Sequence, residues 1–363
     1  MPAVLVTQSV DAAPAARLTG SPASVGQLAY VAASGELDLV AIAADGSVTS
    51  SEKIGPVTTV AAGGTVTVYG PVSSPGGQWL AWGESDQSGS HYSSWVVLRS
   101  QADGSTEKIN TSKNEAGPLG FVGQRLVISN FNGRAWVVQP GTRPTLKLLL
   151  SSLKNTYYGT DRAGVVYESG FALPGHPERI ELLRLNGHST LLHTFPGSMF
   201  TRRNAPLEQG WVASDGSKAV FEQGDHTDFG GVGPTSVAFA VSGLHASTAT
   251  RLGHPGGATP IRRMEGLSFA ADTPYGVWSI AQEQTPTGAV YVDNGHGWQL
   301  FASDSLVVAG NSAGAVITQP AKYVDAGVEA PAFNIQPTDN AVLHIAGATE
   351  TVQIQATAMV WLD

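Results

Sequence analysis

Short runs of apolar and β-branched residues recur along the chain, and each run follows a turn that contains glycine. Seven such segments begin at Val25, Gly76, Val122, Arg162, Asp215, Tyr275 and Ala313. Their turn glycines are Gly26, Gly77, Gly123, Gly164, Gly216, Gly276 and Gly314. The spacing averages roughly 48 residues, which is in the range of propeller blades. Each segment predicts a tight inner hairpin at the glycine, followed by a strand packed between neighbouring blades.

Polar turns between these segments predict a second hairpin in each repeat. Asn-Gly and Asp-Gly pairs are the strongest short signals for a hairpin. They occur in Ala44-Asp45-Gly46, Ala102-Asp103-Gly104, Asn186-Gly187 and Asp293-Asn294-Gly295. In the fourth repeat the pattern predicts strands near 154–159, 163–168, 178–185 and 189–195. Each repeat is therefore expected to be a four-stranded antiparallel meander.

The repeats predict an all-β fold, a single seven-bladed β-propeller of four-stranded antiparallel blades over residues 1–363. The expected blades start roughly at 17, 64, 115, 154, 206, 264 and 305, in the order of the repeats. Two apolar runs, Val4–Val10 and Val352–Leu362, are left over, and one of them is expected to close the ring, since an open ring exposes edge strands. A pair of β-sandwiches is the rival fold, but it needs a linker near the middle, where the sequence shows no change of composition.

Composition and charge exclude several classes of partner. Gly and Pro, at 43 and 21 residues, fit an all-β chain rich in turns. The net charge is −9, and the 20 Lys and Arg residues are scattered, so neither nucleic acid nor an anionic membrane surface is an expected partner. No segment is long and apolar enough for membrane insertion. The chain has no cysteine, which removes thiol chemistry and disulfides. We expect a secreted or periplasmic monomer, with a cytoplasmic location as the alternative.

Two repeats resemble a known family in their local motif. The segments SSPGGQWLAWGESDQSG (73–89) and ASDGSKAVFEQGD (213–225) are similar to the TolB-like propeller repeat, in which Ser-Pro-Asp-Gly precedes an apolar strand. Gly76 stands where that repeat has Asp, and Ser214 where it has Pro. The resemblance implies a TolB-like or WD-repeat-like propeller. It implies no single function, because such propellers serve as scaffolds, peptidase gates, lectins and lyases.

Strand order in a propeller places the loops between second and third strands on one face, and the glycine hairpins on the other. The first face has the longer and more polar loops, so we expect function there. Candidate catalytic residues at this long-loop face are Glu84, Glu168, Glu222, His176 and Tyr158. Carboxylates in that position could serve as acid and base on a sugar, they could bind a cation, or they could simply solvate the ends of the strands.

Arginine pairs and tyrosines on the same face are candidate ligand-binding residues. They are Arg202, Arg203, Arg262, Arg263, Tyr92, Tyr157 and Tyr323. Paired guanidinium groups bind a carboxylate or uronate in a bidentate manner, and they equally form structural ion pairs. Both interpretations stay open.

A polar loop is the weak candidate for a metal site. Glu222, Asp225, His226 and Asp228 offer the oxygen ligands that Ca²⁺ prefers, but without the spacing of an EF-hand loop. We expect no cofactor, with a divalent cation such as Ca²⁺ as the alternative. Ser312 lies in a Gly-x-Ser-x-Gly motif, which we do not assign as a nucleophile, because the motif falls on a hairpin of the opposite face with no helix after it.

These observations favour a propeller that acts as a ligand-binding or interaction scaffold and recognises a protein segment or a glycan on its long-loop face. The alternative is a polysaccharide-active enzyme, a lyase or glycoside hydrolase, with its site on the same face.

Overall fold

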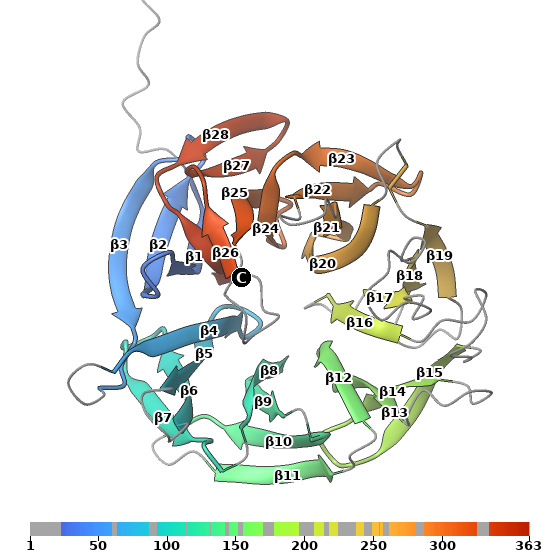
Figure 1. Ribbon diagram of the computed structural model, residues 1–363. Helices are drawn as coiled ribbons and strands as arrows, with labels where there is room; N and C mark the ends of the chain where they lie inside the picture. The colour runs from blue at the N-terminus through green and yellow to red at the C-terminus, as the bar shows by residue number, and fades with distance from the viewer. Residues whose placement is uncertain are drawn as a thin grey trace, which may run out of the picture.

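The computed structural model describes residues 23–59, 64–86, 93–113, 115–130, 132–141, 145–151, 155–169, 178–195, 207–213, 218–223, 237–242, 249–253, 255–256, 261–280, 287–324 and 334–362. The backbone of these residues forms strands and turns without a helix, so none of them belongs to an apolar helix able to cross a bilayer. The strands pair into seven antiparallel sheets arranged around a central axis (Figure 1). The prediction of an all-β propeller with four-stranded antiparallel blades is confirmed.

The first three sheets are numbered here in order around the ring. Sheet 1 has the order β29-β1-β2-β3, with bounds Ala356–Leu362, Ser24–Ala32, Leu37–Ala43 and Val48–Gly55. Sheet 2 contains β4 to β7, at Val66–Ser73, Trp79–Asp86, Ser93–Ser100 and Thr106–Asn110. Sheet 3 contains β8 to β11, at Gly117–Val122, Arg125–Ser129, Arg134–Gln139 and Thr145–Ser151.

The remaining four sheets continue the ring in the same order. Sheet 4 contains β12 to β15, at Asn155–Thr160, Val165–Ser169, Glu178–Leu183 and Ser189–Phe195. Sheet 5 contains β16 to β19, at Leu207–Val212, Lys218–Gln223, Val237–Ser242 and Ala249–Gly253. Sheet 6 contains β20 to β23, at Ile261–Ala270, Thr273–Ile280, Thr287–Asp293 and Trp298–Ala302. Sheet 7 has β24, β25, β27 and β28, at Ser305–Gly310, Val316–Val324, Ala341–Ile345 and Ala348–Val352, and β26 (Asn334–Pro337) pairs with β25.

The buried apolar residues of the described ranges form seven clusters, and each cluster lies between two neighbouring sheets. Leu37 of sheet 1 packs with Trp82 and Val97 of sheet 2, for example. Trp82 and Trp278 are fully buried in such clusters, as expected for tryptophans on inner strands. Full burial of one large apolar side chain contributes about 1.5–3 kcal/mol, so the sheets stabilise one another through their faces.

The ring closes through the C-terminal strand. β29 pairs antiparallel with β1, in a register that places Leu28 opposite Trp361. β29 is the innermost strand of sheet 1, and the C-terminus lies near the centre of the ring (Figure 1). Of the two runs left over in the sequence, the C-terminal one therefore completes the ring, over Ala356–Leu362. The other run, Val4–Val10, lies outside the described residues.

The expected start of the first blade near 17 lies outside the described residues, and the innermost strand of sheet 1 comes from the other end of the chain. The predicted role of Gly26 is wrong, because Gly26 lies within β1 and so forms no inner hairpin. In sheets 2 to 7 the innermost strands begin at Val66, Gly117, Asn155, Leu207, Ile261 and Ser305. The corresponding expected blade starts were 64, 115, 154, 206, 264 and 305.

Four of the other turn glycines occupy inner hairpins as predicted. Gly77, Gly123, Gly164 and Gly314 connect the first two strands of sheets 2, 3, 4 and 7. Gly216 lies outside the described residues. The assignment of Gly276 is wrong, because it lies inside β21 and the hairpin of sheet 6 turns at 271–272. A Cβ at Gly276 would lie 2.9 Å from Trp278 Nε1, so close packing explains this glycine.

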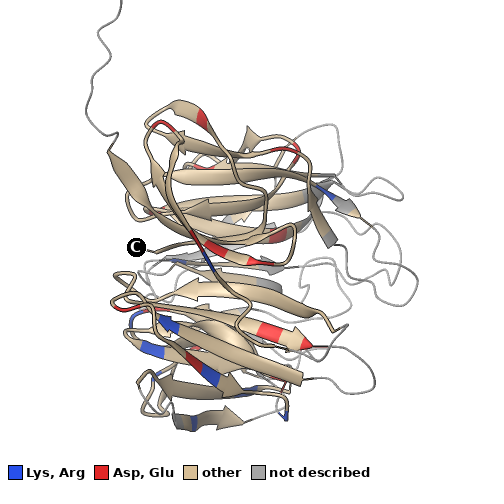
Figure 2. Cartoon of the chain, turned by 90° about the vertical axis from the view of Figure 1, so that its left-hand side faces the viewer, with Lys and Arg blue, Asp and Glu red and all other residues tan. Residues whose placement is uncertain are grey.

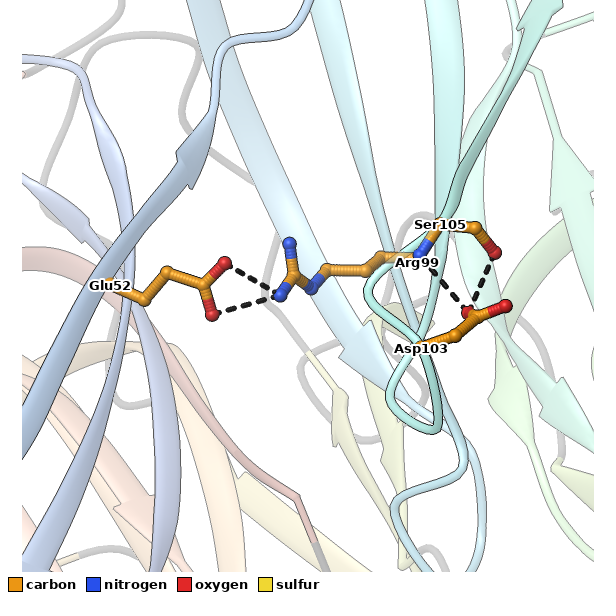
Figure 3. A network of polar contacts seen from close by, with 4 residues as sticks. All are labelled: Glu52, Arg99, Asp103 and Ser105. Carbon is orange, nitrogen blue, oxygen red and sulfur yellow. Dashed lines mark hydrogen bonds and ion pairs between the residues drawn. The ribbon is translucent and has the colours of Figure 1, made fainter.

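The polar hairpins between third and fourth strands occur at the predicted residues. In the Ala102-Asp103-Gly104 turn, Asp103 Oδ1 accepts hydrogen bonds from the Ser105 amide at 3.1 Å and from its hydroxyl at 2.8 Å. Next to this turn, Arg99 Nη2 of β6 donates to both carboxylate oxygens of Glu52 on β3, at 2.8 Å each (Figure 3). This ion pair joins sheets 1 and 2 near the rim of the ring.

The two faces of the ring can be recognised from the side. The C-terminus marks the face of the inner glycine hairpins, which we call the hairpin face (Figure 2). A Cβ at Gly77 would lie 3.2 Å from the carbonyl carbon of Leu362, which places the end of β29 against the hairpin of sheet 2. In this view the Lys and Arg of the described residues are interspersed with Asp and Glu, as expected from their scattered positions in the sequence.

Candidate functional site

A cavity opens on the hairpin face of the ring, at the C-terminal ends of the innermost strands. It has a volume of about 330 Å³. Six of the seven sheets contribute to its lining, through residues 73–76, Arg162, Val212, 267–269, 309–310, Ser312 and 359–361. No single repeat could form this cavity, because it exists only where the inner strands converge.

Polar residues with buried side chains hold three of the hairpins around the cavity. They stand at the first position of the turn, as Ser74, Asp161 and Asn311, and each is at most 3% exposed. Ser74 Oγ accepts a hydrogen bond from the Trp79 amide at 2.9 Å, and Asn311 Oδ1 accepts one from the Ala315 amide at 2.8 Å.

Asp161 has the same role in sheet 4, where its Oδ1 accepts hydrogen bonds from the amides of Ala163 and Gly164, at 2.6 Å each. Side chains of this kind satisfy turn amides and fix the turn. The residue after each of them, Pro75, Arg162 or Ser312, lines the cavity. Rigid hairpins therefore present these three residues towards the axis.

The lining combines one cation, several hydroxyl groups and apolar surface. Arg162 is its only ionisable side chain among the described residues. Ser268 Oγ accepts a hydrogen bond from the Gly310 amide at 2.9 Å. Trp361 Nε1 donates to the Ala309 carbonyl at 3.1 Å, which fixes the indole against β24. The arrangement can bind a small ligand that has both a polar end and an apolar end.

The sequence predicts function on the long-loop face, whereas this cavity lies on the opposite, hairpin face. Ser312 does lie in a hairpin between two strands, so the motif is not a nucleophile elbow, but its residue lines the cavity. The sequence signal available for this face was a polar residue three positions before a hairpin glycine, as Ser74, Asp161 and Asn311 stand before Gly77, Gly164 and Gly314.

Two predicted catalytic residues, Glu168 and Tyr158, lie together in the structure. The Tyr158 hydroxyl on β12 donates to Glu168 Oε2 on β13 at 2.7 Å. Glu168 is only 5% exposed, and burial raises the pKa of its carboxyl above the usual value, while the hydrogen bond from Tyr158 opposes this effect. The Tyr158 ring packs edge-on against Phe221 of sheet 5, so the pair lies at the interface between sheets 4 and 5.

Glu84, a third catalytic candidate, is fully buried and anchors the connection between sheets 1 and 2. Its Oε1 accepts hydrogen bonds from the Val57 amide and from Trp82 Nε1, both at 2.8 Å, and its Oε2 accepts one from the Thr58 amide at 2.9 Å. These three hydrogen bonds hold the carboxylate in place and satisfy it within the fold. The geometry therefore explains Glu84 as a structural residue.

Tyr157 also makes a contact between sheets. Its hydroxyl donates to the Gly133 carbonyl at 2.9 Å, and its ring is tilted against Tyr167 at a centroid distance of 6.0 Å. It thus joins sheets 3 and 4, and the structure does not place it at the cavity.

The other predicted site residues are not described with their side chains. Tyr92, His176, Arg202, Arg203, Asp225, His226 and Asp228 lie outside the described residues. Three other predicted residues lie on strands and not in the expected loops: Arg262 and Arg263 on β20, and Tyr323 on β25. Glu222 lies within β17, one residue before its end. No group of three His, Asp or Glu residues suited to a metal ion occurs in the described part of the chain.

Comparison with known proteins gives the fold and no family. No protein-family model and no curated protein matches the chain. Among solved structures, the chain is similar to a protein from Lactobacillus plantarum at 11% identity and a TM-score of 0.55, with 93% of this chain and 99% of that chain covered.

Two peptidase structures also match. A prolyl endopeptidase structure matches at 15% identity and a TM-score of 0.52, with 92% of this chain and 50% of that one covered. The acylaminoacyl peptidase of Pyrococcus horikoshii matches at 11% identity and a TM-score of 0.51, with 79% and 46% covered. The chain thus spans about half the length of these two peptidase chains. At such identities the similarity concerns the fold alone.

Proposed function

We propose that this protein is a seven-bladed, TolB-like propeller that acts as a ligand-binding scaffold, and that the cavity on its hairpin face is the binding site. The observation that carries the proposal is the convergence of six sheets on one cavity of about 330 Å³ with a mixed lining. That volume is near the lower end of ligand pockets, which span about 300–1,000 Å³. The ligand is therefore small, or it is the end of a larger molecule.

Binding suits this site better than catalysis. Its described lining has neither a carboxylate nor a histidine that could move a proton. The polysaccharide-active alternative relies on carboxylates, and the two whose side chains are described, Glu84 and Glu168, are 0% and 5% exposed. Both are engaged in hydrogen bonds within the fold.

The proposal keeps three further expectations that follow from the sequence. The protein is an exported monomer, it needs no cofactor, and its long-loop face recognises a protein segment or a glycan. Pocket and long-loop face lie on opposite sides of the ring, so a ligand in the cavity leaves the other face free for a partner.

A pair of tryptophan substitutions in one hairpin tests the proposed site. Ser312 lines the cavity, and Ala313, the next residue, is also exposed but does not line it. A small-molecule library is screened against the wild-type protein by ligand-observed NMR, and each hit is then repeated with Ser312→Trp and Ala313→Trp. We expect Ser312→Trp to abolish binding of the hits, because the indole fills the cavity, and Ala313→Trp to preserve it. A library without hits, or hits that bind Ser312→Trp unchanged, would overturn the proposed function.

A further inference from the structure

We infer that the cavity on the hairpin face selects a small organic carboxylate with an apolar part, and that the Arg162 guanidinium binds the carboxylate group. The inference rests on the proposed function, and adds to it the chemical class of the ligand. The carboxylate can belong to a free short acid or to the C-terminus of a peptide, which share this chemistry.

The charge of the described lining points to an anion. Arg162 is exposed at the first hairpin of sheet 4, and no Asp or Glu accompanies it in the described lining. Ion pairs between described residues involve other arginines and lysines, so Arg162 has no described carboxylate as a salt-bridge partner. The neighbouring Asp161 carboxylate turns its Oδ1 inward to two backbone amides. A guanidinium of this kind is suited to bidentate binding of a carboxylate.

A single cation favours a carboxylate over a phosphate. The protein has a net charge of −9, so the general field repels anions and disfavours a second negative charge. One guanidinium neutralises the one charge of a carboxylate, whereas a phosphate dianion would keep a charge without a partner in the described lining.

Ser268 supplies a second polar group in the same lining. Its Oγ is held by the Gly310 amide at 2.9 Å, and the described residues offer its hydroxyl hydrogen no acceptor. The hydroxyl is thus positioned to donate to a ligand oxygen within the cavity. The guanidinium and the hydroxyl of this lining both donate hydrogen bonds. They therefore match an ionised carboxylate, which accepts hydrogen bonds and has no hydrogen of its own to donate.

The apolar part of the lining determines which chemical group fits at the other end of the ligand. Phe269, Met359 and Val212 provide apolar and aromatic surface around the same space. Methionine and phenylalanine adapt well to aromatic or branched apolar groups. A short acid with one such group fits a cavity of about 330 Å³.

The test compares an acid with its neutral isostere. N-acetyl-phenylalanine and N-acetyl-phenylalaninamide have nearly the same shape and differ in the charge. Titration calorimetry with the full chain is expected to show the acid binding about tenfold or more tightly than the amide, the difference expected for a charge-assisted pair. Arg162→Gln is expected to remove that difference by weakening the acid alone, and Arg162→Lys to restore part of it.

Arg125→Gln is the matched control, because Arg125 follows the neighbouring inner hairpin and does not line the cavity. It should leave both affinities unchanged. A parallel titration with a peptide that ends in phenylalanine, free or amidated, distinguishes a peptide C-terminus from a free acid.

The outcomes separate the two proposals. Equal binding of acid and amide, or an Arg162→Gln protein that still prefers the acid, would overturn the carboxylate inference while the binding site stands. Absence of binding by every acid probe also overturns the inference. Library hits that survive in Ser312→Trp overturn the proposed function itself.

Discussion

Glu84 and Glu168 show how strongly the surroundings decide what a residue does. Both lie on the second strand of their sheets and both are buried. Glu84 accepts three hydrogen bonds from N–H donors, whereas Glu168 accepts one hydrogen bond from the described residues, donated by the Tyr158 hydroxyl. Burial with a single hydroxyl donor disfavours the charged form, and so the pKa of Glu168 is raised.

The raised pKa predicts a pH-dependent contribution of Glu168 to stability. A carboxyl whose pKa is higher in the folded state stabilises the fold fully below its unfolded pKa, near 4.5, and loses this contribution as pH rises through the folded pKa. Glu168→Gln keeps an acceptor for Tyr158 and cannot ionise. We expect the variant to melt like the wild type at pH 4 and about one to two degrees higher at pH 7.5.

Melting curves between pH 4 and 8 check this prediction, with Tyr158→Phe as a second variant. The Phe ring preserves the contact with Phe221 but removes the donor that holds the pKa of Glu168 down, so the loss of stability with rising pH should become steeper. If the melting temperatures of Glu168→Gln and the wild type differ by the same amount at every pH, the raised pKa does not explain the contribution of Glu168 to stability.

At the scale of elements, the inner strands approach one another very closely around the axis. Gly310 of β24 is the clearest case, because a Cβ there would lie 2.5 Å from the Phe269 carbonyl oxygen and 2.7 Å from the Ala270 Cβ on β20. The nearest of these atoms, the Phe269 carbonyl oxygen, belongs to the backbone and shifts less readily than a side chain. Glycine at this position therefore allows sheets 6 and 7 to approach.

We expect Gly310→Ala to lower the free energy of unfolding by about 1–3 kcal/mol, the usual cost of overpacking. Urea denaturation followed by tryptophan fluorescence measures the change. Gly256→Ala is the control, since that glycine has open space around its Cβ position and an ordinary φ. If the two substitutions have equal effects, close approach of the strands is not the reason for Gly310.

At the scale of the whole molecule, closure by β29 makes the stability of the ring depend on the last strand. Buried side chains of β29 belong to the core between sheets 7 and 1. Gln319, which is fully buried, accepts a hydrogen bond from the Ala356 amide at 2.9 Å and donates to the Asp339 carbonyl at 2.7 Å. The side chain thus fixes the start of β29 against sheet 7.

Removal of residues 356–363 should open the ring. The truncated chain loses the partner strand of β1 and exposes the core between sheets 7 and 1, so we expect cooperative unfolding to be lost and the protein to aggregate. Thermal denaturation and light scattering measure both effects. A synthetic peptide of residues 356–363 added in trans should restore part of the transition. A truncated chain that melts like the intact one would show that β29 does not hold the ring together.

Much of the fold could be predicted from local sequence. Glycine turns at Gly77, Gly123 and Gly314, where φ is positive, and polar turns such as that of Asp103, are set by backbone conformation over a few residues. A turn signal of this kind can be recognised in a single repeat, and its recurrence in other repeats strengthens the prediction of a hairpin. The errors at Gly26 and Gly276 have another origin, because a glycine inside a strand looks the same in sequence as one in a turn.

The candidate site was predictable only in part. The sequence by itself determined that the chain forms repeated antiparallel meanders, that these form a propeller, and that one terminal run closes it. Tertiary structure alone decided which terminus does so, why Glu84 is satisfied within the fold, and that Arg162, Ser268 and Met359 share one cavity. The reason is distance along the chain: strand turns depend on neighbours in sequence, whereas the cavity joins residues from six sheets that meet only when the ring is closed.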